Sequence, residues 1–355
     1  MTSTTRILDS HVHQWDPRTT PREATMAVKL FGWSPRLLDF VVRVGMPKPL
    51  VDFVGRGEYA LNAYLPADLR EDWAEHAPRL LGVVHVQAGW KGKAHRDVVG
   101  ETHWLETIDP EGTIIRAIVG AAHLEAPDLG DVLDAHTRAS ARFRGVRDML
   151  ASHPSDAIVD FAREPELLSN PAWRRGYAML GERGLSYDAW MYHHQLDAFA
   201  EFAEATPDTP FVLCHLGTPV ALAGEFAGHG TSAAERNRIE DQWRASIARF
   251  AEISHARFKI SGLLMPILGH GAEYRPTPMT TAEFVDRVGP LATWAIDTIG
   301  IDRCMFGSNF PIDKVSIDYA SVIAGFDQLL STRDDQDKER FFESVARDFY
   351  RIEAP

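Results

Sequence analysis

Eight short runs of apolar and β-branched residues recur along the 355-residue chain, and most are followed by a stretch with helical spacing. The runs cover residues 7–9, 81–89, 114–124, 143–150, 184–192, 210–217, 256–264 and 303–312. Strands that alternate with helices usually pair in parallel, because each helix carries the chain back across the sheet. The pattern therefore predicts a (β/α)8 TIM barrel, with an open doubly wound sheet as the alternative. No Gly-x-Gly-x-x-Gly follows the first run, so a dinucleotide-binding sheet has no direct support.

The stretches between the runs carry helix signals. "PADLREDWAEHA" contains Asp68 as a candidate cap, and "PAWRRGYAMLGER" places Pro171 in its first turn. The stretch "HQLDAFAEFAEA" has apolar residues at helical spacing. "TTAEFVDRVGPLATWAIDTIG" opens with Thr281 and Glu283 and is expected to form one helix that ends at Gly300.

Three connections are too long for plain barrel turns: 16–62, 218–240 and 265–280. Each follows an expected strand, so in a barrel each would lie over the face that carries the active site. We expect a single domain over 1–355, with 16–62 inserted after the first strand. The exposed apolar residues expected in 16–62 would suit a lid or a subunit contact in a homo-oligomer.

Composition narrows the range of partners. The net charge is −13, which argues against non-specific binding to nucleic acid or to an anionic membrane surface. The two cysteines, Cys214 and Cys304, stand in apolar runs, so a disulfide framework is not expected and a reducing cytosol fits. The N-terminal "MTSTTRILDS" lacks the apolar core of a signal peptide, and no run is long enough to span a membrane. We expect a soluble cytoplasmic protein.

A histidine pair ends the first run, in "ILDSHVHQWDP". Residues i and i+2 of a strand point to the same face, so His11 and His13 should both point into the barrel. Two imidazoles there can share one divalent ion. His215 stands near the end of the sixth run, and Asn309 with Ser308 stands near the end of the eighth, at the same rim of the barrel. The alternative is that each histidine only hydrogen-bonds the end of its own strand.

Further candidates follow from strand alternation. His85 and Gln87 share a face of their run and are expected to point into the barrel. Arg147, near the end of the fourth run, would bind a carboxylate of an anionic substrate. Tyr192 and His194 have matching parity near the rim. The alternative role for His85 and Gln87 is a hydrogen-bonded core network, and for Arg147 it is a salt bridge to a helix.

One lysine has two interpretations. Lys259 and Ser261 share a face of the seventh run, so the lysine could point into the barrel. It could equally extend its charge to solvent along an apolar stem.

The chain resembles the amidohydrolase superfamily, in the branch called amidohydrolase family 2. The stretches that carry the likeness are "DSHVHQWDP", "VHVQAGW", "RFRGVRDML", "NPAWRRGYAML", "LSYDAWMYHHQL", "FVLCHLGTP", "FKISGL" and "RCMFGSNFPIDK", which run from residue 9 to 314. The resemblance implies a distorted barrel in which His11 and His13 are usually metal ligands. It implies that His215 is a ligand or polarises the substrate carbonyl. Relatives of this type include lactonases, some of which work without metal, and more distant decarboxylases and hydratases.

The sequence departs from that family at Asn309, where an aspartate usually stands. The aspartate would take a proton from the hydrolytic water, which an amide cannot do. Loss of an anionic ligand should also weaken metal binding. Asp313 and His194 are the alternative candidates for the general base, and Asp313 could instead cap the next element.

These residues lead to a ranked set of functions. The first is hydrolysis of a small lactone or related cyclic carbonyl compound, with one divalent ion, zinc being favoured, held by His11, His13 and His215. The second is a lyase, either a decarboxylase or a hydratase, on the same barrel. The third is a binding protein that has lost catalysis through Asn309. No Gly-x-Ser-x-Gly stretch supports an acyl-enzyme route.

Overall fold

The computed structural model describes residues 5–57 and 61–353, and its centre is a sheet of eight parallel strands in the order β1 to β8. The strands are β1 (Ile7–Val12), β2 (Leu80–Val86), β3 (Ile115–Ala121), β4 (Phe143–Arg147), β5 (Ser186–Ala189), β6 (Phe211–Leu213), β7 (Arg257–Ile260) and β8 (Cys304–Phe306). All eight fall within or overlap the predicted runs. Sequential order is the order of a barrel, whereas a doubly wound sheet reverses direction, so the barrel prediction is confirmed.

The last strand returns to the first. His13 donates its backbone N–H to the carbonyl of Phe310 at 2.8 Å, and Asn309 donates to the carbonyl of His11 at 2.8 Å. These bonds bring the end of β8 against the end of β1 and nearly close the barrel. Residues from opposite ends of the chain, 11–13 and 308–310, are therefore neighbours.

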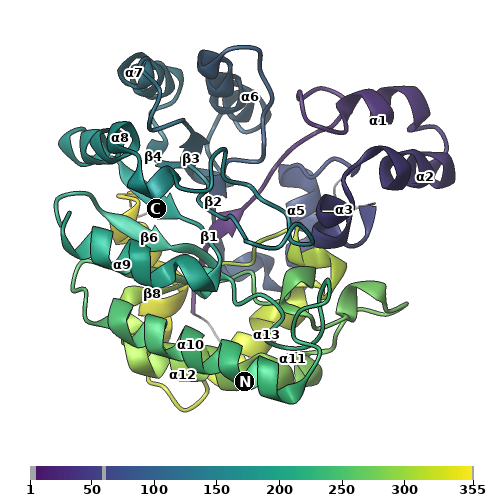
Figure 1. The fold of residues 1–355 in the computed structure, drawn as a ribbon, viewed down its shortest axis with the longest axis vertical. Helices are drawn as coiled ribbons and strands as arrows, with labels where there is room; N and C mark the ends of the chain where they lie inside the picture. Colours follow the sequence, from purple (N-terminus) through teal and green to yellow (C-terminus); the bar gives the residue numbers. More distant parts are fainter. Residues whose placement is uncertain (1–4, 58–60, 354–355) are drawn as a thin grey trace.

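Helices surround the strands (Figure 1). They are α1 (Thr25–Phe31), α2 (Pro35–Gly45), α3 (Lys48–Val54), α5 (Pro66–Trp73), α6 (Val99–Ile108), α7 (Leu129–Ala139), α8 (Pro171–Glu182), α9 (Leu196–Glu204), α10 (Ala233–Ala251), α11 (Thr281–Arg287), α12 (Gly289–Ile299), α13 (Tyr319–Leu329), α14 (Asp335–Glu339) and α15 (Val345–Phe349). In the described residues, no helix combines the length and the apolar character that a membrane-crossing segment requires.

The helix signals were partly correct. Pro171 is the first residue of α8, as predicted, and Asn170 caps that helix by accepting from the N–H of Ala172. The expectation of Asp68 as the capping residue was wrong in position. Leu65 is the N-cap residue. Asp68 stands at the third position of the helix, and its carboxylate accepts the backbone N–H of Leu65 at 2.7 Å.

The expectation of a single helix over 281–300 was also wrong, because this segment forms two helices. The first, α11, ends at Arg287, and α12 begins at Gly289, so the break falls at Val288, two residues before Pro290. Proline cannot continue a helix that precedes it without loss of a backbone hydrogen bond. The sequence contained this signal.

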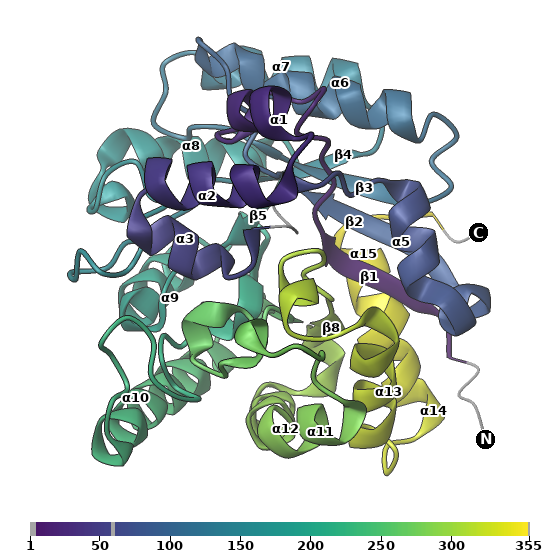
Figure 2. The ribbon, with the colours of Figure 1, turned by 90° about the vertical axis from the view of Figure 1, so that its right-hand side faces the viewer.

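The barrel interior is packed at one end and polar at the other. Early strand residues such as Leu8, Val84 and Met305 form one cluster with Ala346 and Tyr350 near the C-terminus. Helix α15 therefore closes this end of the barrel, and Figure 2 shows it beside β1. Polar side chains are left to fill the interior toward the carboxyl ends of the strands.

The segment after β1 forms a helical arm, which we define as α1, α2 and α3. The arm stands out from the barrel in Figure 1 and follows one side of it in Figure 2. Phe53 of α3 is buried in a second apolar cluster with Trp190 and Met265, which follow β5 and β7. The arm thus lies over the carboxyl ends of the strands, as predicted for 16–62.

Candidate active site

The cavity at the carboxyl ends of the strands, called here the inner chamber, has a volume of about 180 Å³. Five of the residues predicted from the sequence line it: His13, Gln87, Arg147, His215 and Asn309. They follow or end β1, β2, β4, β6 and β8, so the barrel brings together side chains nearly 300 residues apart. The remaining walls are mostly aromatic and aliphatic.

His11 and His13 face one another. Their Nε2 atoms are 3.2 Å apart, and both rings are buried. Two ligand nitrogens at about 2.0–2.1 Å from a tetrahedral ion lie about 3.3 Å apart, so this spacing fits one shared ion. The carbonyl of Val86 accepts from His13 Nδ1 at 2.7 Å, which leaves the lone pair of His13 Nε2 available.

The pairing of His11 and His13 depends on a local irregularity. The register of β1 against β2 shifts between Asp9 and Val12. Leu8 belongs to the packed interior, yet His11, three residues later, also faces inward, where its ring lies 4.4 Å from that of His215. Asp9 stabilises the bend, because it accepts the N–H groups of both His11 and Ser308.

His215 is held in an unusual backbone conformation. Its φ of 56° is left-handed, and it follows β6 in a short tight turn. Nδ1 of His215 lies 2.9 Å from Ser261 Oγ. Gly262 packs so closely that a Cβ there would lie 2.4 Å from the same nitrogen, so only glycine leaves room for the ring.

All three imidazoles are neutral near pH 7. Burial lowers the pKa of His11, His13 and His215 well below the usual value. Arg147 lowers the pKa of all three further, and Lys259 lowers that of His11 and His215. Neutral imidazoles offer the lone pairs that a metal ion or a water molecule requires. The donor type and spacing therefore fit a divalent ion, while the nearby positive charges weaken its binding.

Arg147 is buried at the chamber wall. Nη2 donates to the carbonyl of Gln87 at 2.7 Å, and the guanidinium lies over the ring of Trp190 at 5.7 Å. Nε has no partner among the described residues. A buried N–H without a partner is costly, and a substrate oxygen could satisfy it.

Arg22 is a chamber residue that the sequence reasoning missed. It comes from the start of the arm and stacks over Trp15 at 4.0 Å. Within the described chain, its buried Nη1 also lacks a partner. Nothing in the local sequence marks it, because the arm must first fold over the barrel.

Asn309 follows β8, four strands after the strand that carries Arg147, and lines the chamber. Its backbone has a left-handed φ of 59°, which asparagine tolerates better than most residues. Its Nδ2 donates to Asp313 Oδ1 at 2.7 Å. The Asn309 Oδ1 is left to accept from a water or a substrate. Asp313 itself lies behind Asn309, where burial raises the pKa of its carboxyl to about 7.

Five of the predicted residues do not line the chamber. Two of them are Asp313 and His11, whose buried ring lies behind that of His13. His85 lies against Glu101 of α6, at 4.0 Å, on the helix side of β2. Tyr192 donates its hydroxyl to the carbonyl of Val159 at 2.6 Å, and the ring of His194 lies 5.0 Å from that of His153. For His85 the expected direction was wrong, since Val84 and Val86 point inward instead.

A second polar group lies deeper in the barrel. Lys259 is fully buried and pairs with Asp188 at 2.6 Å, and Tyr350 donates to the same carboxylate at 2.9 Å. Lys259 Nζ also lies 3.3 Å from His11 Nδ1. Of the two interpretations of Lys259, the inward one is confirmed.

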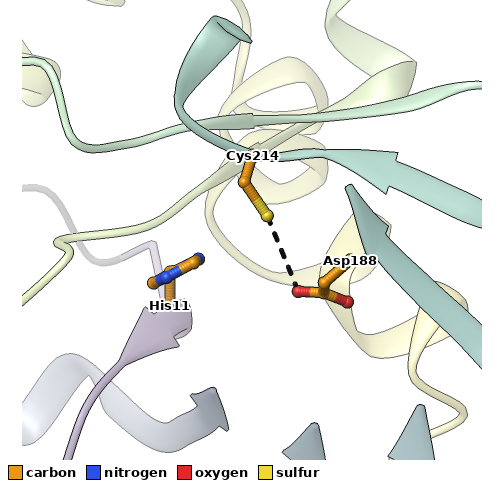
Figure 3. A group of neighbouring side chains, drawn as sticks. All are labelled: His11, Asp188 and Cys214. Atoms are coloured by element: carbon orange, nitrogen blue, oxygen red, sulfur yellow. Dashed lines mark hydrogen bonds between the residues drawn. The ribbon is translucent and has the colours of Figure 1, made fainter. Parts of the chain in front are cut away.

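Part of this deeper group resembles a metal site. Ligand atoms of His11, Asp188 and Cys214 lie within 4.8 Å of one another (Figure 3). Asp188 is already neutralised by Lys259, however, and burial raises the pKa of the Cys214 thiol to about 12. Since metals bind the thiolate, this group is a poor ligand set in its present protonation and pairing state.

Comparison with known proteins agrees with this geometry. The model of the amidohydrolase family matches residues 8–352. The chain belongs to the amidohydrolase family. An uncharacterised protein of Sinorhizobium fredii, y4mH, is 30% identical over 98% of both chains. An L-fucono-1,5-lactonase of Burkholderia multivorans is 28% identical over 76% of this chain and 80% of that one.

A solved structure shows the same fold. It is an amidohydrolase from Burkholderia multivorans with bound zinc, with a TM-score of 0.71, 22% identity, and coverage of 98% of this chain and 100% of that one. The match to the family over residues 8–352 therefore carries the family assignment, and the solved structure shows that the fold is the same.

Proposed function

We propose that this amidohydrolase hydrolyses a small lactone or a related cyclic carbonyl compound in the inner chamber. The observation that carries the proposal is the convergence of His13, His215, Arg147 and Asn309 on one small cavity at the ends of four strands. The likeness to an L-fucono-1,5-lactonase supports the reaction class.

The ion, which we expect to be zinc, would be held by His11 and His13, with His215 as the third residue available to it. When bound, a divalent ion polarises a carbonyl or lowers the pKa of a water molecule. A zinc-containing structure of the same fold supports this cofactor.

The remaining chamber residues bind and orient the reactants. The unpartnered Nε of Arg147 donates to an oxygen of the substrate and favours one with negative charge. Asn309 Oδ1 accepts from the attacking water, since its Nδ2 is committed to Asp313. No carboxylate is among the described residues that line the chamber, so with the ion held by His11 and His13 we assign the proton of the water to the imidazole of His215.

The test is pH-stat titration of ring opening with six-membered lactones, using protein supplied with zinc. We expect the medium to acidify, and His215→Gln to lower kcat/KM by about 100-fold or more, the size of a general-base contribution. His194→Gln is the matched control, because His194 lies outside the chamber. Equal losses in the two variants would contradict the assignment.

A lyase is the second candidate, and Asn309 is the observation that favours it. Decarboxylation requires a proton to be delivered to a carbanion and requires no activated water, so an amide at this position is less of a handicap. Release of carbon dioxide from a panel of aromatic acids, without acidification by lactones, would replace the hydrolase proposal with this one.

A further inference from the structure

The inner chamber is too small to be the whole substrate site. Its volume of about 180 Å³ is below the roughly 300–1,000 Å³ typical of ligand sites. It adjoins a second cavity of about 660 Å³, called here the outer cleft. The two share the walls Arg22, Leu50, Val54, Gly89, Met149 and Phe161.

The outer cleft runs between the helical arm and the loop of residues 156–161. Its apolar walls come from the arm, including Val42, Met46 and Val51, and from Ile158 and Val159 of the loop. Figure 2 shows the arm helices that form the first of these walls.

The charged side chains of the cleft are mostly paired with each other or with backbone. Arg43 donates to Asp39 at 2.8 Å, and Lys91 forms an ion pair with Glu23. Asp160 accepts the N–H of His153. The cleft thus presents apolar surface to a ligand, with few polar groups left to recognise one.

The chamber itself is a poor fit to a ring that carries hydroxyl groups. Trp15, Phe53, Trp190 and Met265 line it together with the polar residues already described. Hydroxyls that faced these side chains would lose their water without gaining a partner, which is unfavourable.

From these observations we infer that the substrate is a small ring with an apolar substituent, an alkyl chain or an aryl group. The ring lies in the inner chamber, and the substituent passes Leu50 and Phe161 into the outer cleft. The inference deepens the proposed lactone hydrolysis and rests on it for the reaction, but the cleft can be tested by binding alone.

The experiment compares six-membered lactones that share one ring: δ-valerolactone without a substituent, δ-decalactone with a pentyl chain, δ-dodecalactone with a heptyl chain, and L-fucono-1,5-lactone with hydroxyls. Turnover is measured by pH-stat on the full chain supplied with zinc, and binding by calorimetry. If each added methylene is buried, kcat/KM should rise by up to about fourfold per methylene. L-fucono-1,5-lactone should be the poorest substrate.

Two variants of helix α2 locate the effect. Val42 is half-buried in the cleft wall, whereas Val44, on the same helix, is 71% exposed and outside the cleft. Val42→Asp should abolish the advantage of the heptyl chain, measured within the variant as the ratio of kcat/KM for δ-dodecalactone to kcat/KM for δ-valerolactone. Val44→Asp should leave that ratio unchanged. Circular dichroism checks that both variants are folded.

The outcomes separate the two proposals. Turnover of all lactones without dependence on chain length, or a preference for L-fucono-1,5-lactone, overturns the inference and leaves lactone hydrolysis intact. Binding that strengthens with chain length and is lost in Val42→Asp, without turnover, supports the cleft and overturns the hydrolase. If neither turnover nor binding depends on chain length, the inference is overturned whatever the fate of the hydrolase proposal.

Discussion

Two groups of buried polar side chains lie one above the other in the barrel, and they differ in how completely they are paired. In the deeper group, Asp188 accepts from both Lys259 and Tyr350, so its charge is compensated. In the inner chamber, Arg147 and Arg22 each keep a buried N–H that has no partner in the part of the chain that the structure describes. A buried charge alone is therefore a poor marker of function, and unpaired hydrogen-bonding groups beside a cavity are a better one.

The deeper group should carry stability. Asp188→Ala leaves the Lys259 ammonium uncompensated inside the barrel, and we expect a loss of about 3–5 kcal/mol in the free energy of unfolding. The double variant Asp188→Leu with Lys259→Met should recover most of it, because no lone charge remains. Urea denaturation measures both. A loss below about 1 kcal/mol in Asp188→Ala would show that the pair contributes no more than a surface ion pair.

Asp313 should make stability depend on pH. Burial raises the pKa of its carboxyl to about 7, against about 3.9 in an unfolded chain. Between these values the folded protein holds a proton that the unfolded chain releases, so the contribution of Asp313 to stability is complete below pH 4 and is lost as pH rises toward 7.

The matched variant for this effect is Asp313→Asn, which keeps the shape. Relative to it, the wild type should lose on the order of 3–4 kcal/mol of unfolding free energy between pH 4 and pH 7. Denaturation across that range measures the difference. Parallel curves for the two proteins would mean that Asp313 titrates normally.

Arg147 should behave in the opposite way to Asp188. Arg147→Met removes a donor that we assign to the substrate, and we expect kcat/KM for a lactone to fall by about 10- to 100-fold, the value of a hydrogen bond from a charged group. Stability should change by less than about 1 kcal/mol, because an apolar side chain replaces a partly unpaired charge. Arg144→Met, on the other face of β4, is the control. An Arg147 variant that is fully active but unstable would place this residue with the deeper group.

Much of the fold was predictable because it depends on local pattern. The eight runs are short and apolar, and the barrel order follows from their alternation with helices. The segment expected to form one long helix, 281–300, forms two because of Pro290, a local signal that the spacing of apolar residues does not register.

The site was predictable where a residue follows the end of a strand, and less so where it depends on irregular backbone or on distant partners. His11 and His13 face the interior because β1 is irregular between Asp9 and Val12. For His85, strict alternation along β2 predicted the interior, whereas the side chain lies beside Glu101. The inward direction of Lys259 depends on its ion pair with Asp188, 71 residues away in the chain. Arg22 reaches the chamber only because the arm folds over the barrel.

The metal content of the purified protein tests the central claim, that the histidines of the chamber form the working site, most directly. We expect about one divalent ion per chain in the wild type and in His85→Phe, which replaces a buried histidine whose ring nitrogens have no hydrogen-bond partner in the described chain. His13→Ala should hold none and should lose lactone hydrolysis, with stability nearly unchanged. A metal-free wild type whose activity survives chelation, or a His13→Ala protein that keeps both ion and activity, would contradict the account.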